Sequence, residues 1–284
     1  MLAPKKASVT LQAMLANRCN PAPPAPAKRI VSLVPSQTEL LYALGLDEEV
    51  VAITKFCVHP PKWFTTKPRI GGTKTVNIEA IKALQPDLII GNKEENVREQ
   101  VLELEQYAPV FVTDVATLQD ALEMIEAIGK LVDREERANQ IAMEIKAGFE
   151  QLKPLQLPLR AAYLIWKDPY MAAGGDTFIN DMLCRCGFSN LFSSTSRYPE
   201  VVTFVEDNLQ QSPAVNPSLS LSSCSLLLLS SEPYPFKEKH VRQLQQLLPD
   251  CKIVLVDGEM FSWYGSRLLL APDYFKKLIE QIQG

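Results

Sequence analysis

The stretch from Thr117 to Leu152 contains no proline, and its apolar residues recur at spacings of three and four. These spacings place apolar side chains along one side of an α-helix, so the sequence predicts a single long helix with one buried stripe. At 1.5 Å of rise per residue, about 30 helical residues span roughly 45 Å, which is longer than a single small lobe. We therefore expect this helix to bridge two lobes.

Short apolar, β-branched runs alternate with helical patterns on both sides of this stretch. The predicted strands cover residues 29–34, 50–53, 87–90, 110–113, 161–166, 226–230 and 253–257. Helices are predicted at 36–45, 77–84, 97–107, 176–186, 236–248 and 268–282, with a capping box at Ser36 and Glu39 and an N-cap at Asn77. Strands that alternate with helices form mostly parallel sheets. The sequence thus predicts an α/β fold of two Rossmann-like lobes joined by one long backbone helix.

The expected boundaries are a flexible leader at 1–28, an N-terminal lobe at 29–115, the bridging helix at 116–153 and a C-terminal lobe at 154–284. The leader is rich in proline and in positive charge, which is typical of an extended segment. It lacks the apolar run of a secretory signal, so a cytoplasmic location stays an alternative to export. No stretch approaches the roughly 20 apolar residues of a membrane helix.

Net charge and cysteine spacing exclude two further classes of protein. The chain has 29 Lys and Arg against 33 Asp and Glu, a formal net charge of −4, and no long basic block. Nucleic acid is therefore a poor candidate partner, because binding its phosphates needs clustered cations. The 6 cysteines lie far apart in 284 residues, and there are 2 histidines. We expect mostly buried free thiols and no metal site.

Candidate ligand-binding residues follow the predicted strands, because ligands of parallel α/β sheets bind beyond the carboxyl ends of the strands. They are Ser36, Gln37, Phe56, Asn92, Lys93, Trp166, Tyr170, Glu232, Phe261, Trp263, Tyr264 and Arg267. The aromatic members suit a large, partly apolar ligand, although packing in a core is the competing interpretation for each of them. For Arg267 the competing interpretation is a structural ion pair with Asp257 or Glu259.

The common catalytic motifs are missing. Neither a G-x-G-x-x-G fingerprint after the first strand nor a G-x-S-x-G elbow is present, and Thr73 interrupts the weak match to a phosphate loop at 71–75. Cys57 and His59 are a possible nucleophile pair, but no third group is evident to orient them. We predict no catalytic residue and no catalytic cofactor, and hence a protein that is not an enzyme.

Three blocks and the long central helix together resemble the helical-backbone substrate-binding proteins of ABC importers, and above all their cobalamin-binding members. The blocks are RIVSLVPSQTELLYALGL (29–46), VNIEAIKALQPDLIIG (76–91) and FSWYGSRLL (261–269). The resemblance implies a periplasmic monomer that holds cobalamin or a related corrinoid between two α/β lobes and delivers it to a membrane permease. It further implies one docking carboxylate per lobe, at Glu79 and Glu206.

One departure from the family pattern leaves the ligand open. Cobalamin binders carry a tryptophan after the strand at 87–90, where this chain has Asn92 and Lys93. A receptor for a ferric siderophore or haem is the first alternative, and it would direct Lys55, Lys93, Arg197 and Arg267 toward an anionic chelate. The second alternative is a cytosolic corrinoid-handling protein or an enzyme on the same scaffold, suggested by Cys57 and His59. Free Zn or Mn is the least favoured cargo, because two histidines are too few to build its site.

Overall fold

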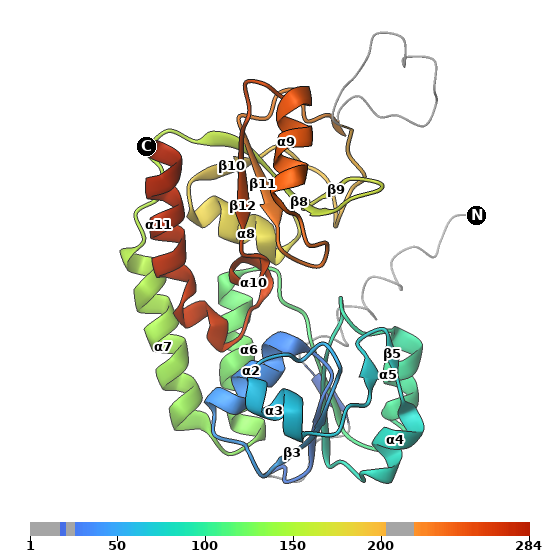
Figure 1. The fold of residues 1–284 in the computed structure, drawn as a ribbon. Helices are drawn as coiled ribbons and strands as arrows, with labels where there is room; N and C mark the ends of the chain where they lie inside the picture. The colour runs from blue at the N-terminus through green and yellow to red at the C-terminus, as the bar shows by residue number, and fades with distance from the viewer. Residues whose placement is uncertain (1–17, 21–25, 203–218) are drawn as a thin grey trace, which may run out of the picture. The chain divides into compact units, whose positions relative to one another are not determined.

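A computed structural model describes residues 18–20, 26–202 and 219–284, which divide into two compact units (Figure 1). Unit 1 comprises the described residues up to Val115, together with 119–146 and 263–269. Unit 2 comprises 116–118, 270–284 and the described residues of 147–262. Each unit contains one mostly parallel sheet, which confirms the predicted α/β fold class. Residues 119–146 and 263–269 belong to unit 1, although the sequence boundaries placed them outside the N-terminal lobe.

The unit 1 sheet has the strand order β1-β7-β6-β2-β3. Its strands are β1 (Arg18–Asn20), β2 (Ile30–Ser32), β3 (Val50–Ile53), β6 (Leu88–Asn92) and β7 (Val110–Thr113). Strands β7, β6, β2 and β3 are parallel, and β1 pairs antiparallel with β7. The leader prediction is therefore wrong for residues 18–20, whose backbone covers what would otherwise be the open edge of β7.

Short helices connect the strands of unit 1. They are α2 (Pro35–Ala43), α3 (Pro61–Thr66), α4 (Ile78–Ala83) and α5 (Arg98–Leu104), with a small hairpin of β4 (Gly71–Gly72) and β5 (Thr75–Val76) before α4. The Asn77 side chain accepts the Ala80 N–H at 3.0 Å, which confirms the predicted cap of α4. The predicted capping box of α2 is wrong. The helix starts at Pro35, its N-cap is Val34, and no side chain caps it.

The predicted helix from Thr117 to Leu152 is two helices, α6 (Leu118–Leu131) and α7 (Glu135–Gln151). Asp133 adopts φ +57°, and the Arg134 N–H donates to the Gly129 carbonyl at 2.8 Å. This pairing, with Asp133 N–H near the Lys130 carbonyl at 3.5 Å, is a Schellman motif that ends α6. A Cβ on Gly129 would lie 2.3 Å from the Ala138 Cβ, so glycine permits the close approach of α6 and α7. The single long helix that carries the chain from unit 1 into unit 2 is therefore α7.

The unit 2 sheet has the order β10-β8-β11-β12, and all of these strands are parallel. They are β8 (Leu159–Trp166), β10 (Phe188–Asn190), β11 (Leu226–Ser230) and β12 (Lys252–Val256), with β9 (Met171–Ala172) antiparallel beside β8. Every residue of β11 is buried, because this strand lies between β8 and β12. The unit 2 helices are α8 (Phe178–Arg185), α9 (Glu238–Leu247), α10 (Gly258–Ser262) and α11 (Ala271–Gln283), and the 3₁₀ helix η3 (Ser266–Leu269) belongs to unit 1.

Candidate functional site

Phe56 is the predicted aromatic ligand-binding residue that unit 1 exposes at its surface. The carboxyl ends of β2, β3, β6 and β7 share one edge of the sheet because these strands are parallel. Phe56 follows β3 at this edge, and it is 51% exposed. The Lys55 amino group lies 5.1 Å from the Phe56 ring centroid, and a Cβ on Gly72 would approach the ring to 3.1 Å. The edge therefore displays an aromatic ring beside a cation.

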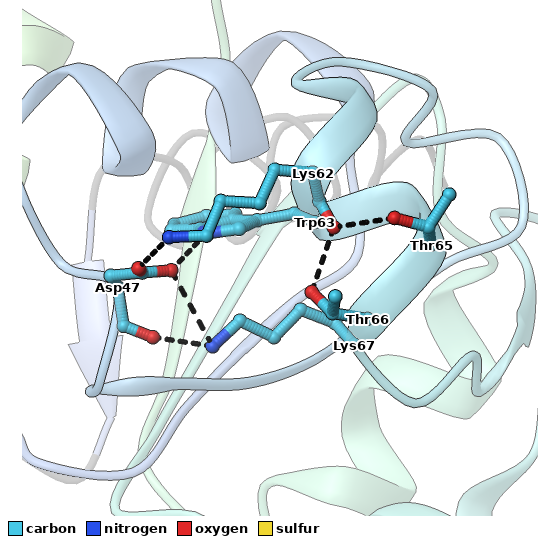
Figure 2. Close-up of polar contacts among 6 residues, drawn as sticks. All are labelled: Asp47, Lys62, Trp63, Thr65, Thr66 and Lys67. Carbon is cyan, nitrogen blue, oxygen red and sulfur yellow. Dashed lines mark hydrogen bonds and ion pairs between the residues drawn. The ribbon is translucent and has the colours of Figure 1, made fainter.

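A cluster around Asp47 anchors α3, the helix that follows Phe56 in the chain. Figure 2 shows Lys62, Trp63 and Lys67 converging on Asp47 from α3 and the residue that follows it. The Trp63 indole N–H donates to Asp47 Oδ1 at 2.5 Å, and Trp63 is fully buried with its ring 5.3 Å from that of Tyr42. Hydrogen bonds from Lys62 and then Trp63 hold the pKa of Asp47 below its usual value. These contacts hold α3, which follows the loop that carries Phe56, against Asp47 in the turn after α2.

Gln37 and Asn92 were predicted to touch a ligand, but the structure buries both beneath the sheet edge. Their exposed fractions are 0% and 1%. The Gln37 amide N–H donates to Thr113 Oγ1 at 2.5 Å, and the Asn92 amide N–H donates to the same oxygen at 3.1 Å. Asn92 Oδ1 also accepts the Glu94 N–H at 2.8 Å. Asn92 therefore stabilises the turn after β6, and neither side chain is accessible at the surface.

Lys93 is exposed but paired within unit 1, and Ser36 is buried. The Lys93 ammonium group forms an ion pair with Asp114, which follows β7. Ser36 is 2% exposed and forms part of the surroundings of the Tyr264 hydroxyl. Tyr264 is buried, which raises the pKa of its hydroxyl well above the usual value. Its hydroxyl lies 3.4 Å from Glu95 Oε1.

The segment 263–269 packs on α2, although more than 200 residues separate the two in the sequence. The Arg267 guanidinium contacts Glu39 at 3.0 Å from Nε to Oε2 and at 2.8 Å from Nη2 to Oε1. It also lies 5.2 Å from the Trp263 ring, and the same ring meets His59 edge-on at 5.5 Å. Arg267 thus forms an ion pair with Glu39, which was not predicted as its partner. Trp263 is 6% exposed, so the structure places it in an internal contact.

Of the four candidates in unit 2, Trp166 is the most exposed, at 41%. It meets Tyr234 edge-on, with 5.8 Å between the ring centroids. Tyr170 is partly buried, which raises the pKa of its hydroxyl, and Glu232 accepts the Ser262 hydroxyl at 2.7 Å. Phe261 has no exposed surface and packs between Tyr163 and Phe275 at 5.0 and 4.8 Å. Phe261 therefore belongs to the core, and Trp166 remains the surface candidate.

The predicted docking residue Glu79 is exposed on α4. Its side chain is 82% exposed and forms an ion pair with Lys82 at 2.7 Å. Lys82 also lies 3.9 Å from the Tyr107 ring centroid. A pocket of about 280 Å³ lies next to this group, lined by Ile81, Lys82, Gln85, Pro86, Ile89, Leu104, Tyr107 and Ala108. Glu206, the second predicted docking residue, lies outside the described residues.

Cys57 is not arranged as a nucleophile. Its sulfur contacts the Thr38 and Thr54 hydroxyls at 3.0 and 3.1 Å, and burial raises the pKa of the thiol to about 11. Such a thiol is protonated at neutral pH, whereas nucleophilic catalysis needs the thiolate. The geometry gives no support to an enzyme built on Cys57 and His59.

Two negative findings apply to residues 18–20, 26–202 and 219–284. No helix in these ranges has both the length and the hydropathy needed to span a bilayer. The same ranges contain no group of three or more His, Cys, Asp or Glu side chains placed to hold a metal ion.

Residues 30–214 match the family model of the periplasmic binding proteins, so the chain belongs to that family. It is 29% identical over 199 residues to a vitamin B12-binding protein of Vibrio cholerae, covering 68% of this chain and 71% of that protein. The vitamin B12-binding protein of Pectobacterium atrosepticum is 26% identical over 254 residues, 86% of this chain and 85% of the relative. A third, of Vibrio campbellii, is 28% identical over 181 residues, 62% of this chain and just under two thirds, 66%, of its own length.

Solved structures share the fold. The periplasmic vitamin B12 binding protein of Vibrio cholerae superposes with a TM-score of 0.68 at 22% identity, covering 91% of this chain and 98% of the other. A periplasmic haem-binding protein from Roseiflexus superposes with a TM-score of 0.68 at 18% identity, covering 89% and 99%. The sequence resemblance to helical-backbone binding proteins, and to the cobalamin-binding members in particular, is thereby confirmed.

Proposed function

We propose that this chain is the substrate-binding component of an ABC importer, with cobalamin or a related corrinoid as its cargo and no catalytic step. The vitamin B12-binding relatives at 26 to 29% identity support the ligand class. The structural observation that carries the proposal is the exposed Phe56 at the carboxyl edge of the unit 1 sheet. An aromatic ring in this position offers apolar area to the face of a large macrocycle.

The charges of unit 1 favour a corrinoid over an anionic chelate. An anionic siderophore or haem needs cations that are not already neutralised. Lys93 is paired with Asp114, and Arg267 is paired with Glu39. The Lys55 ammonium group beside Phe56 and the likeness to a haem-binding solved structure support haem or a ferric siderophore, which is our second candidate cargo.

Isothermal titration calorimetry with cyanocobalamin, cobinamide, haemin and a ferric hydroxamate tests the ligand. We expect both corrinoids to bind. We also expect Phe56→Ala to weaken this binding about 10-fold or more, because burying a phenyl ring contributes about 1.5–3 kcal/mol. The matched control is Tyr107→Ala, which removes an aromatic ring that is 54% exposed after α5 and should leave affinity unchanged. Tight haemin binding without corrinoid binding would contradict the corrinoid proposal and support haem as the cargo.

The importer role itself is tested at Glu79. We propose that this carboxylate contacts a permease arginine, and that Glu206 does the same for unit 2. Glu79→Lys should lower ligand uptake by permease-containing vesicles at least several-fold, because it places two like charges at the contact, while ligand affinity stays constant. Glu126→Lys, at an exposed position of α6, is the control with the same change of charge. Equal uptake by both variants contradicts this docking role.

The proposed class also sets the expected compartment and assembly. We propose that the protein acts in the periplasm as a monomer. Fractionation of the host cells and the mass of the purified protein in solution test these two points. Recovery from the cytoplasm alone would favour the corrinoid-handling alternative.

A further inference from the structure

Cys224 and Cys251 enter the same end of the unit 2 sheet. Strands β11 and β12 pair in parallel with Leu226 opposite Lys252, and the Lys252 N–H donates to the Ser225 carbonyl at 3.0 Å. Cys224 lies two residues before β11, and Cys251 lies directly before β12. Both side chains belong to one hydrophobic cluster, and they are 7% and 4% exposed. Both thiols thus lie just before neighbouring strands and within one buried cluster.

The two thiols are close enough to shift each other's pKa. The neighbouring Cys251 side chain is the largest influence on the Cys224 thiol and lowers its pKa, and Cys224 raises the pKa of Cys251. The sulfurs also contact backbone carbonyls, at 3.0 Å from Cys224 to Leu226, 3.9 Å from Cys224 to Arg160 and 3.7 Å from Cys251 to Lys252. Of the two sulfurs, Cys224 is therefore the more easily deprotonated.

The other cysteines with described side chains have different surroundings. Cys57 is enclosed by two threonine hydroxyls. Cys184 and Cys186 are separated by one residue at the end of α8, one exposed and the other buried. Helical residues two apart do not face each other, so this second pair is poorly placed to form a bond. Among the described residues, the neighbouring strand starts and the shared buried cluster favour the pair of Cys224 and Cys251.

We propose that Cys224 and Cys251 are a disulfide-forming site that is closed by a small disulfide oxidant. The Cys224 thiolate attacks one sulfur of the oxidant R–S–S–R, and the first thiol RSH leaves with a proton. Cys251 then loses its proton and attacks the Cys224 sulfur, which displaces the second RSH. Two electrons pass from the cysteines to the oxidant, and the new bond closes a ring from residue 224 to residue 251 that contains β11 and α9. This site is independent of the proposed ligand and of the importer role.

The test uses the full chain with Cys184→Ser, which removes the exposed thiol and leaves five of the six cysteines. The reduced protein is incubated with oxidised glutathione, its thiols are titrated in denaturant, and its peptides are mapped by mass spectrometry. We expect a fall from five thiols to three, a link between the peptides that contain Cys224 and Cys251, and a rise in the thermal midpoint. The ring limits the freedom of the unfolded chain, which is the reason for that rise.

Two further variants keep the proposal falsifiable. Adding Cys224→Ser or Cys224→Ala leaves four thiols. We expect all four to remain after incubation with oxidised glutathione, and the thermal midpoint not to rise. The alanine variant serves if the serine variant does not fold. Five remaining thiols after an exposure that fully oxidises dithiothreitol overturn the proposal. A bond mapped to any other cysteine pair overturns it as well.

Discussion

Arg267 binds both carboxylate oxygens of Glu39, a residue 228 positions earlier in the chain. The side chains are 11% and 20% exposed, so this bidentate pair is largely shielded from water. It fixes η3 to α2 within unit 1. Arg267, a predicted ligand-binding residue, therefore has a structural role within unit 1.

Removing one partner of this pair should be costly. For Arg267→Ala and for Glu39→Ala we expect the free energy of unfolding to fall by about 2–4 kcal/mol, because each leaves a mostly buried charge without its partner. The double variant should lose less than the sum of the two. Chemical denaturation measures these values. Lys130→Ala is the control, since it breaks the exposed pair with Glu135 and should change stability by less than about 0.5 kcal/mol. Additive losses would show that the two residues do not interact.

Gly265 permits the close approach of the same segment to α2. A Cβ at this position would lie 2.4 Å from the Ser36 carbonyl oxygen and 3.3 Å from the Leu40 Cβ. We expect Gly265→Ala to lower the free energy of unfolding by about 1–3 kcal/mol, as overpacking does. Gly45→Ala is a useful comparison, because φ is +78° there but nothing lies within 4 Å of the added atom. A neutral Gly265→Ala variant would contradict the packing described here.

The Asp47 cluster predicts a dependence of stability on pH. Hydrogen bonds from Lys62 and Trp63 lower the pKa of Asp47 in the folded state below 3.8. The contribution is therefore complete above the unfolded pKa and is lost as the pH falls through the lower folded value. We expect the unfolding midpoints of the wild type and Asp47→Asn to differ at pH 7 and to converge below about pH 4. A difference that stays constant down to the acid limit would rule out this assignment.

Cys57 should react slowly with alkylating agents. With a pKa of about 11, the thiol carries only about 0.1% thiolate at pH 8. We expect iodoacetamide to label Cys57 about 100-fold or more slowly in the folded protein than in the unfolded chain, as followed by mass spectrometry of its peptide. The exposed Cys184 provides the comparison within the same sample. Rapid labelling of Cys57 would reopen the nucleophile hypothesis.

Local patterns in the sequence are sufficient to predict most of the fold. The strands at 50–53, 110–113 and 226–230 match the predicted residues because each is a compact apolar run. The cap at Asn77 is predictable because its partner lies three residues away. Each of these features depends on neighbours in the chain, which a single sequence displays directly.

Features that depend on distant contacts were missed. α6 ends at Leu131, and Asp133 shortly after it takes the left-handed conformation that glycine usually occupies, so no glycine marks the boundary. The sequence does not reveal the partner of Arg267, because Glu39 matches a capping box with Ser36 at the start of α2. Gln37 and Asn92 follow strands as ligand-binding residues do, yet they turn inward to Thr113. Position along a strand predicts the edge of a sheet but not the direction of a side chain.

The division of the chain has a practical consequence for anyone wishing to express unit 1 by itself. Its seven C-terminal residues, 263–269, are flanked on both sides by residues of unit 2. A fragment cut at Val115 or Lys146 would lack Arg267 and Gly265, and with them the η3 segment that packs on α2. An autonomous version would need that peptide supplied as a graft or in trans.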